Sequence, residues 1–280
     1  MFDAVSFPGG GNRCYWQGGF WETVAPQLGV EPTLVVGVSG GAFAAANCLL
    51  GFGPKVRAKV IDGPRLAPRD FDWRALLTGG APFPVAPLYL ALLEETFDDA
   101  AFAAIKASPA DLRIMVSRPP RGWPTSLAAM TGLMSYQIEK KLFQPVHPRF
   151  GRKLGFTADY LSVRSLPNAR AWAHATYASA CVPPMIPVQR IDDAPALDGG
   201  MVDNAPIEPL LDIEKAGGRT LVLLTRRYPR LPQIKNRVYV QPSEKIGVGQ
   251  FTVTKPEGIR AAYQLGVRDG EAFVREMSKQ

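Results

Sequence analysis

The sequence is poor in histidine and cysteine, with two and three residues of each in a chain of 280. Cys14, Cys48 and Cys181 are scattered, odd in number and without C-x-x-C spacing, so neither a disulfide framework nor a zinc site is indicated. The acidic residues form no spaced loop of oxygen ligands, which leaves no evident calcium site. We therefore expect no metal, no cofactor, and buried thiols in a reducing compartment.

Long hydrophobic runs are also missing. No segment reaches the roughly 18 apolar residues of a membrane-spanning helix. The chain enters its first apolar run within a few residues of Met1, without a charged-then-apolar leader. The pattern predicts a cytoplasmic protein with no transmembrane segment and no signal peptide, and it leaves export by a signal-independent route open.

The composition is that of one large globular domain. Of the residues, 46% are hydrophobic, and neither a linker nor a repeat interrupts the chain. Apolar strands alternate with helices, which predicts an α/β fold: a three-layer α/β/α sandwich with a mostly parallel sheet, in a single domain over residues 1–280. The expected strands cover residues 4–7, 33–36, 112–117 and 220–224. The expected helices cover residues 16–28, 42–50, 169–180 and 206–216.

Gly37, Ser39 and Gly41 form a G-x-S-x-G pattern between the apolar run 34–36 and the alanine-rich run 42–46. A strand, a sharp turn and a helix are predicted, with the serine at the turn. Such an elbow needs glycines because its backbone is crowded, and it exposes the hydroxyl at a helix N-terminus, where partial positive charge stabilises an anion. Ser39 is the candidate nucleophile, although a purely structural turn has the same pattern.

A nucleophilic serine needs a base, and neither histidine is well placed to be one. His147 lies in a proline-flanked loop and His174 in an apolar-periodic stretch, so both are interpreted as structural residues. Asp198 precedes Gly199 and Gly200 and is predicted to lie on a tight turn. Its carboxylate, with an ordinary pKa of about 4, has to be desolvated and hydrogen-bonded to act as a base. The same run also fits a simple hairpin turn.

Three consecutive glycines, Gly9, Gly10 and Gly11, follow the first predicted strand and precede Arg13. Their N–H groups can converge on one anion because no side chain obstructs them, and the arginine adds a positive charge close by. The run lacks the last glycine of a dinucleotide fingerprint and the Gly-Lys-Ser/Thr of a P-loop. An oxyanion hole is therefore favoured over a phosphate site.

These motifs resemble those of the patatin-like phospholipase family, whose chains carry a G-G-G-x-R/K loop, a G-x-S-x-G elbow and a D-G-G/A motif in this order. The segment 178–184 is similar to the family's A-S-x-A-x-P segment, and 200–207 is similar to its G-G-x-x-D-N-x-P continuation. The tail, residues 255–270, looks like the terminal helix of bacterial members. The resemblance spans most of the chain.

The resemblance implies a Ser39/Asp198 dyad, in which the serine attacks an ester carbonyl and the aspartate accepts its proton. The amides of Gly10 and Gly11, with Arg13, would form the oxyanion region. The supporting turn residues would be Gly37, Gly41, Gly199 and Gly200.

One position departs from the family pattern, because Cys14 stands where a glycine usually follows the basic residue. We expect its side chain to pack under the following helix rather than to narrow the oxyanion loop.

Residues 63–91 form a proline-rich apolar insertion. The segment is too apolar for a solvated linker, and we expect a lid or an acyl-chain wall, to which residues 123–134 contribute more of the same surface. A satellite core packed on the sandwich is the alternative.

The net charge of +7 includes a cluster of basic residues after the last predicted strand: Arg226, Arg227, Arg230, Lys235 and Arg237. We expect either transient contact with an anionic membrane surface or a solvated loop. No nucleic-acid-binding signature accompanies the cluster, so nucleic acid is not an expected partner.

The sequence thus predicts a serine acyl hydrolase acting on phospholipids or lysophospholipids through an acyl-enzyme. Two alternatives stay open: a general carboxylesterase or thioesterase with the same dyad, and a lipid-binding or regulatory protein with little activity. A preference for long acyl chains would distinguish the lipid hydrolase from the first alternative, and labelling of the serine would distinguish it from the second.

Overall fold

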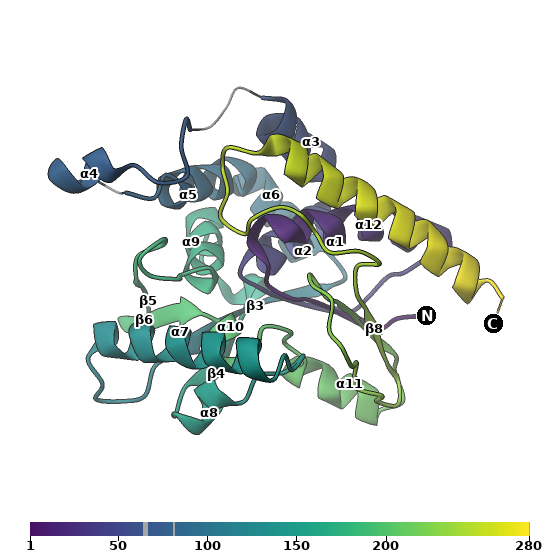
Figure 1. Cartoon of the computed structure of the whole chain (residues 1–280). Helices are drawn as coiled ribbons and strands as arrows, with labels where there is room; N and C mark the ends of the chain where they lie inside the picture. The colour runs from purple at the N-terminus through teal and green to yellow at the C-terminus, as the bar shows by residue number, and fades with distance from the viewer. Residues whose placement is uncertain (64–66, 81, 280) are drawn as a thin grey trace.

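A central sheet runs through the protein between two layers of helices (Figure 1). The computed structural model describes residues 1–63, 67–80 and 82–279. Within these residues the sheet has eight strands in the order β5-β6-β3-β2-β1-β7-β8, with β4 paired to β3. The strands are β1 (Ala4–Phe7), β2 (Leu34–Val38), β3 (Asp111–Arg118), β4 (Thr157–Ser162), β5 (Gln189–Ile191), β6 (Ala194–Asp198), β7 (Thr220–Leu223) and β8 (Arg237–Val240).

The five strands from β3 to β8 are parallel, and β4, β6 and β5 join one side in antiparallel pairs. The central strands are buried on both faces, which explains their continuous apolar runs. Ala4 and Val36 pack toward Leu210 in one layer. Val5 and Val35 join the larger core in the other. The predicted three-layer, mostly parallel architecture is confirmed, with antiparallel strands added at one edge.

The helices form one layer on each face of the sheet. The upper layer in Figure 1 contains α1 (Tyr15–Leu28), α2 (Gly40–Leu50), α3 (Gly53–Arg57), α5 (Val85–Thr96), α6 (Asp99–Ala107), α9 (Ala169–Ser179) and α12 (Pro256–Met277). The lower layer contains α7 (Thr125–Leu142), α8 (Phe150–Lys153), α10 (Gly200–Asp203) and α11 (Leu211–Lys215). Among the described residues no helix is both long enough and apolar enough to cross a bilayer.

Two long helices, α1 and α12, approach closely because glycines face each other across the crossing. A Cβ atom on Gly19 would lie 2.1 Å from the carbonyl oxygen of Tyr263, and one on Gly266 would lie 2.1 Å from that of Trp16. Trp16 also donates from Nε1 to Asp269, at 2.7 Å. The C-terminal helix is thereby fixed over the first helix of the sandwich.

The expected elements agree with the structure where the periodicity is strong. The four expected strands correspond to β1, β2, β3 and β7, and the first three expected helices to α1, α2 and α9. The helix expected over 206–216 is shorter: a 3-10 turn covers Glu208–Leu210, and α11 follows. Pro209 has no N–H group and cannot donate an α-helical hydrogen bond to the residue four positions earlier. A short 3-10 turn therefore forms here before the α-helix begins.

The proline-rich insertion divides into two parts. Residues 64–66 and 81, which belong to it, lie outside the described residues. The short helix α4 (Trp73–Leu77) projects from the body of the protein, with Trp73 and Leu77 exposed (Figure 1). Helix α5, in contrast, packs against α9, and its Ala86 is buried. The second part of the insertion thus belongs to the helical layer over the sheet.

Candidate active site

Ser39 lies at the junction of β2 and α2 in a strained backbone conformation, with φ 55° and ψ −135°. A non-glycine residue adopts such angles only where its surroundings impose them. A Cβ atom on Gly41 would lie 2.1 Å from the carbonyl oxygen of Phe7, and one on Gly37 would lie 2.5 Å from Cα of Ala42. The glycines of the elbow are thus required by close backbone contacts, and the hydroxyl is held at the N-terminus of α2.

A second serine holds this turn in place. The N–H of Ser39 donates to Oγ of Ser179 at 2.8 Å, and the Ser179 hydroxyl donates to the carbonyl of Met115 at 2.6 Å. Ser179 is fully buried at the end of α9. No role was predicted for Ser179, although it lies in the A-S-x-A-x-P segment. That motif is the signal by which it could have been found.

Asp198 ends β6 and lies beside Ser39. Its carboxylate accepts a hydrogen bond from the N–H of Gly200 at 2.7 Å. Burial raises the pKa of Asp198 to about 6, and this N–H and the nearby Ser39 side chain act in the opposite direction. At neutral pH the carboxylate is therefore ionised but more basic than an exposed one, as a general base requires.

The glycines after Asp198 allow its turn to approach the sheet. A Cβ atom on Gly199 would lie 2.6 Å from the carbonyl oxygen of Met115, and one on Gly200 would lie 2.8 Å from Oδ1 of Asp198. The hydroxyl of Ser117 donates to the Asp198 carbonyl at 2.9 Å. The run is a strand-to-helix junction leading into α10. It is not a hairpin turn; the hairpin lies earlier, at 192–193, between β5 and β6.

The glycine-rich loop lies against the start of α2. A Cβ atom on Gly9 would lie 3.2 Å from Cβ of Ser39, and one on Gly40 would lie 2.9 Å from the carbonyl oxygen of Gly11. Gly9 donates its N–H to the carbonyl of Asn204 at 3.0 Å. In the described part of the chain no hydrogen bond engages the N–H groups of Gly10 and Gly11. These two amides are thus the ones available to an anion beside Ser39.

Asn204 joins the glycine-rich loop to the Asp198 turn. Its Nδ2 donates to the carbonyl of Gly9 at 3.1 Å, while Thr225 donates to the same carbonyl at 2.6 Å. Asn204 belongs to the segment 200–207, which is similar to a motif of the family. No role was predicted for this residue. Its contacts identify it as a positioning residue.

Asn12 and Arg13 attach the loop to the segment 248–252. The N–H of Asn12 donates to Gln250 at 3.0 Å and its side chain donates to Thr252 at 2.5 Å. Arg13 donates from Nε to Val248 at 3.3 Å. The guanidinium is therefore partly used in fixing this covering segment.

Cys14 is turned into the protein. Its Sγ lies 3.7 Å from the carbonyl oxygen of Pro8, and burial raises the pKa of the thiol far above its usual range. The side chain packs at the start of α1, as expected, and carries no charge beside the oxyanion loop.

Neither histidine forms a hydrogen bond with Ser39 in the described structure. His147 bonds Asp203 through Nδ1 at 3.1 Å and the Tyr239 hydroxyl through Nε2 at 2.8 Å. His174 bonds Gln189 at 3.2 Å. These contacts agree with the interpretation of both histidines as structural residues.

A cavity of about 140 Å³ begins at Ser39 and follows one side of α2. Gly40, Ala44 and Cys48 recur along it at four-residue intervals. From Ser39 to Cys48 the helix rises about 13 Å. The apolar wall consists of Phe43, Val56, Val60, Val85, Leu88, Leu92, Ile186 and Ile259.

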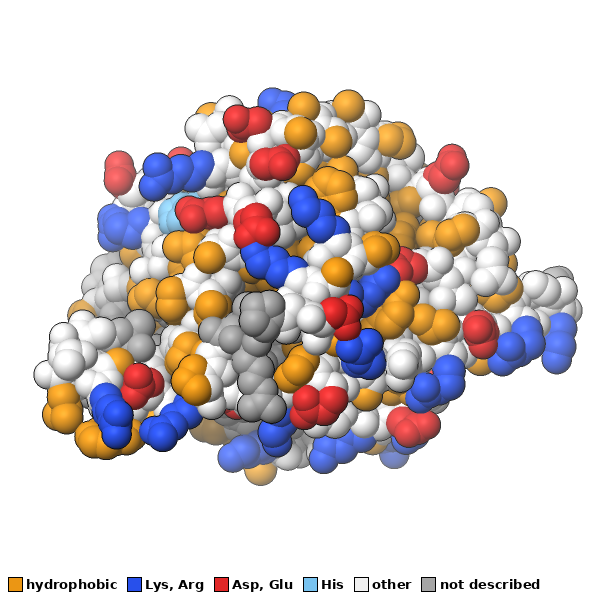
Figure 2. Space-filling view, turned by 90° about the horizontal axis from the view of Figure 1, so that it is seen from above, with side chains coloured by type: hydrophobic (Ala, Val, Ile, Leu, Met, Phe, Trp, Pro, Cys, Tyr) orange, Lys and Arg blue, Asp and Glu red, His pale blue; other side chains and the backbone are white. Residues whose placement is uncertain are grey.

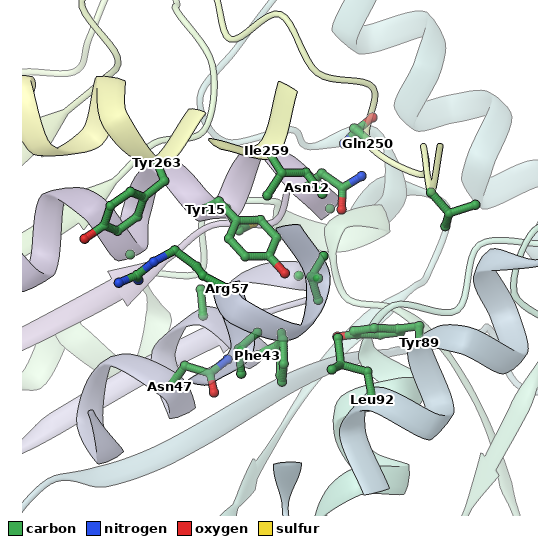
Figure 3. Close-up of a pocket in the computed structure, with 18 of the residues that line it drawn as sticks. Asn12, Tyr15, Phe43, Asn47, Arg57, Tyr89, Leu92, Gln250, Ile259 and Tyr263 are labelled. Atoms are coloured by element: carbon green, nitrogen blue, oxygen red, sulfur yellow. The ribbon is translucent and has the colours of Figure 1, made fainter. Parts of the chain in front are cut away.

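The hydroxyls of Tyr15 and Tyr89 point into the cavity from α1 and α5 (Figure 3). Burial raises the pKa of both, so they stay protonated. At the far end Arg57 forms an ion pair with Glu22 at 2.6 Å and lies over the ring of Tyr263. The cavity is thus apolar along its length and closed by a polar cluster.

The sequence model of the patatin-like phospholipase family matches residues 5–211, a range that contains the glycine-rich loop, Ser39 and Asp198. The crystal structure of VipD from Legionella pneumophila is similar at 14% sequence identity with a TM-score of 0.49. That similarity covers 98% of this chain and 66% of the length of the VipD chain. No curated protein sequence matches this chain. The family match covers well over half of the residues, and the chain belongs to the patatin-like phospholipase family.

Proposed function

We propose that this protein is a lipid acyl hydrolase that cleaves acyl esters of phospholipids or lysophospholipids with a Ser39–Asp198 dyad. Family membership supports the general class of reaction. The observation that carries the proposal is the combination at one place of a strained serine, a buried carboxylate with a raised pKa, and an apolar cavity that starts at the serine.

In the proposed reaction Oγ of Ser39 attacks the ester carbonyl carbon while its proton passes to the carboxylate of Asp198. The oxyanion is stabilised by the N–H groups of Gly10 and Gly11 and by the N-terminus of α2. The proton then passes from Asp198 to the departing alcohol oxygen as that bond breaks. Acyl-Ser39 remains.

In the second half of the reaction, water attacks the acyl-serine ester and gives a proton to Asp198. The second oxyanion collapses, the fatty acid leaves, and Ser39 recovers its proton from the aspartate. A single carboxylate serves in both halves because its pKa of about 6 lets it accept and return a proton near neutral pH.

The cavity favours a lipid ester over a short soluble ester. Its walls are mainly apolar, and burying a methylene group contributes about 0.8 kcal/mol, so long acyl chains gain binding energy there. A carboxylesterase acting on short esters would not need this length. Cys14 departs from the family pattern, but its side chain is buried against the Pro8 carbonyl, which is compatible with a working oxyanion loop.

Hydrolysis of para-nitrophenyl esters of graded acyl length tests the proposal. We expect activity that rises with acyl length in the wild type and falls by about a thousandfold or more in Ser39→Ala and Asp198→Ala. Circular dichroism of both variants controls for folding. An inert wild type that still binds fatty acids would contradict the enzyme and favour a lipid-binding protein.

A further inference from the structure

Helix α7 presents an apolar stripe to solvent. Leu127, Met130, Met134, Ile138 and Leu142 recur every three or four residues, so they share one side of the helix. Their side chains are between 45% and 70% exposed. Single exposed apolar residues are ordinary, but a continuous stripe over the length of an 18-residue helix is not.

The stripe continues beyond both ends of the helix. Trp123 precedes α7 and Phe143 follows it, and both are exposed. Between α7 and α8 the surface is hollowed into a groove lined by Met134, Phe150 and Leu154 among others. Together, residues 119–154 form what we call the α7 surface.

The opposite side of α7 holds the helix without help from the stripe. Ala128, Ala129 and Gly132 are buried, and a Cβ atom on Gly132 would lie 3.0 Å from Sδ of Met201. Glu139 accepts the backbone N–H groups that begin α8, at 2.8 to 2.9 Å. The helix is therefore anchored on the domain, and the exposed stripe is left without a structural task.

The α7 surface carries an excess of positive charge. Residues 119–154 contain six Lys or Arg against one acidic residue, Glu139, which is buried in the cap of α8. Arg152 forms an ion pair with Glu208 at 3.0 Å, and the other basic residues are Arg121, Lys140, Lys141, Arg149 and Lys153. The face over α3, α5 and α12 differs, because acidic and basic side chains alternate there (Figure 2). Apolar and cationic groups together match an anionic lipid surface.

The basic cluster identified after β7 contributes less to such a surface than its sequence suggests. Arg237 is buried in an ion pair with Glu214 at 2.6 Å, and Arg226 lies over the ring of Tyr228. Arg230, however, lines a second groove together with Phe143 at the end of α7. One member of the cluster thus extends the cationic edge of the α7 surface.

The inner side of α7 borders the candidate active site. Gly132 of α7 packs against Met201, which follows Asp198 by three residues. Burial raises the pKa of Tyr136 on the same helix, and the charges of Arg226, Asp198 and Arg13 act on it as well. Burial, Arg226 and Arg13 lower the pKa of Lys140 to about 8, so cations are crowded where the helix meets the site. An anionic headgroup would relieve this crowding.

We propose that the α7 surface docks on an anionic phospholipid membrane, with the apolar stripe at the level of the headgroups and the cations around it binding lipid phosphates. This inference goes beyond the proposed reaction, because it concerns the surface on which the protein acts rather than the bond it cleaves. It stands even if the ester substrate is different.

Vesicle sedimentation tests the proposal with the full chain. We expect binding to mixed phosphatidylcholine–phosphatidylserine vesicles that is at least about tenfold stronger than to phosphatidylcholine alone, and that weakens with salt. Met130→Ser combined with Met134→Ser and Ile138→Gln should weaken binding to the mixed vesicles by about a hundredfold, because three apolar anchors are lost. Leu211→Gln on α11, an exposed apolar residue away from the stripe, is the matched control and should bind as the wild type does.

A second variant separates charge from apolar contact. Lys141→Glu with Lys153→Glu should weaken binding to the anionic vesicles by about tenfold or more and leave binding to phosphatidylcholine unchanged. Hydrolysis of a short soluble ester should be unchanged in both sets of variants, so failure of the docking proposal is distinguishable from failure of the proposed function. Equal binding by wild type and variants overturns the proposal. So does light scattering that shows wild-type dimers dissociating in the α7 variants without lipid.

Discussion

Helices α2 and α7 both border the candidate active site, and both carry a row of small or apolar residues at helical spacing, yet the two rows face different surroundings. The row on α2 lines the cavity that begins at Ser39. The row on α7 is exposed on the surface of the domain. The same periodicity in sequence thus gives an interior wall in one case and an outward surface in the other.

The difference follows from what covers each helix. Helix α2 is the first helix after the central strand β2, and α1, α3, α5, α6 and α9 pack around it. Helix α7 packs against α8 and α10 and leaves its opposite side exposed. Changes on α2 should therefore alter the reaction of long acyl esters whether they are dissolved or in a membrane, whereas changes on α7 should alter only reaction at a lipid surface.

The largest expected effect comes from the site that both helices share. Asp198→Asn keeps the size of the side chain and removes its basicity, so hydrolysis should fall by about a thousandfold on soluble esters and vesicles alike. Steady-state kinetics on both substrates measures this. If Asp198→Asn retained activity on one of the two substrates, hydrolysis of that substrate would not use Asp198 as its base.

Bulky substitutions at two depths along the α2 side of the cavity should give the next largest effect. Ala44→Phe blocks the cavity one turn from Ser39, and Cys48→Phe blocks it one turn deeper. We expect Ala44→Phe to lose about a hundredfold on long acyl esters and little on acetyl esters, and Cys48→Phe to lose activity only on the longest chains. Identical profiles for the two variants would place the acyl chain elsewhere.

The pH dependence of the wild type should be smaller. Because Asp198 has to be ionised to act as base, kcat/KM on a soluble ester should fall about tenfold per unit below a pH of about 6 and level off above it. The α7 variants should show the same profile, since they leave the base untouched. A midpoint near the ordinary aspartate value would show that burial does not perturb this carboxylate.

The smallest expected effect is on stability. The folded-state pKa of Asp198, about 6, lies above its ordinary value of 3.8, so ionisation of the buried carboxylate costs stability above that pH. Asp198→Asn should raise the free energy of unfolding by about 3 kcal/mol in mildly alkaline solution, with the gain shrinking as pH falls toward 4. Denaturant titration at both pH values measures this. A destabilised variant in alkaline solution would show that the hydrogen bonds of Asp198 outweigh its desolvation.

The sequence predicts the parts of this protein that depend on local rules. The elbow at Ser39 and the glycine-rich loop follow strong strand and turn signals, and the structure brings the elbow, the loop and Asp198 together. The antiparallel strands β4, β5 and β6 were not foreseen, because β4 and β6 pair with β3, which is distant in the sequence, and β5 pairs only with β6.

The supporting contacts could not be predicted from local pattern. Ser179 reaches Ser39 across 140 positions, and Asn204 reaches Gly9 across 195. Such contacts exist only once the sheet is assembled. The exposure of the α7 stripe is likewise a property of the assembled layers, since its spacing alone also fits a buried helix.

The central claim is that Ser39 is an activated nucleophile at the mouth of an acyl-chain cavity. Intact-protein mass spectrometry after reaction with a long-chain alkyl fluorophosphonate, followed by peptide mapping, tests it most directly. The account predicts one phosphonyl adduct on Ser39, none in Ser39→Ala, and slower labelling of Ala44→Phe by the long probe than by a short one. A wild-type protein that stays unlabelled, or an adduct on another residue, would contradict it.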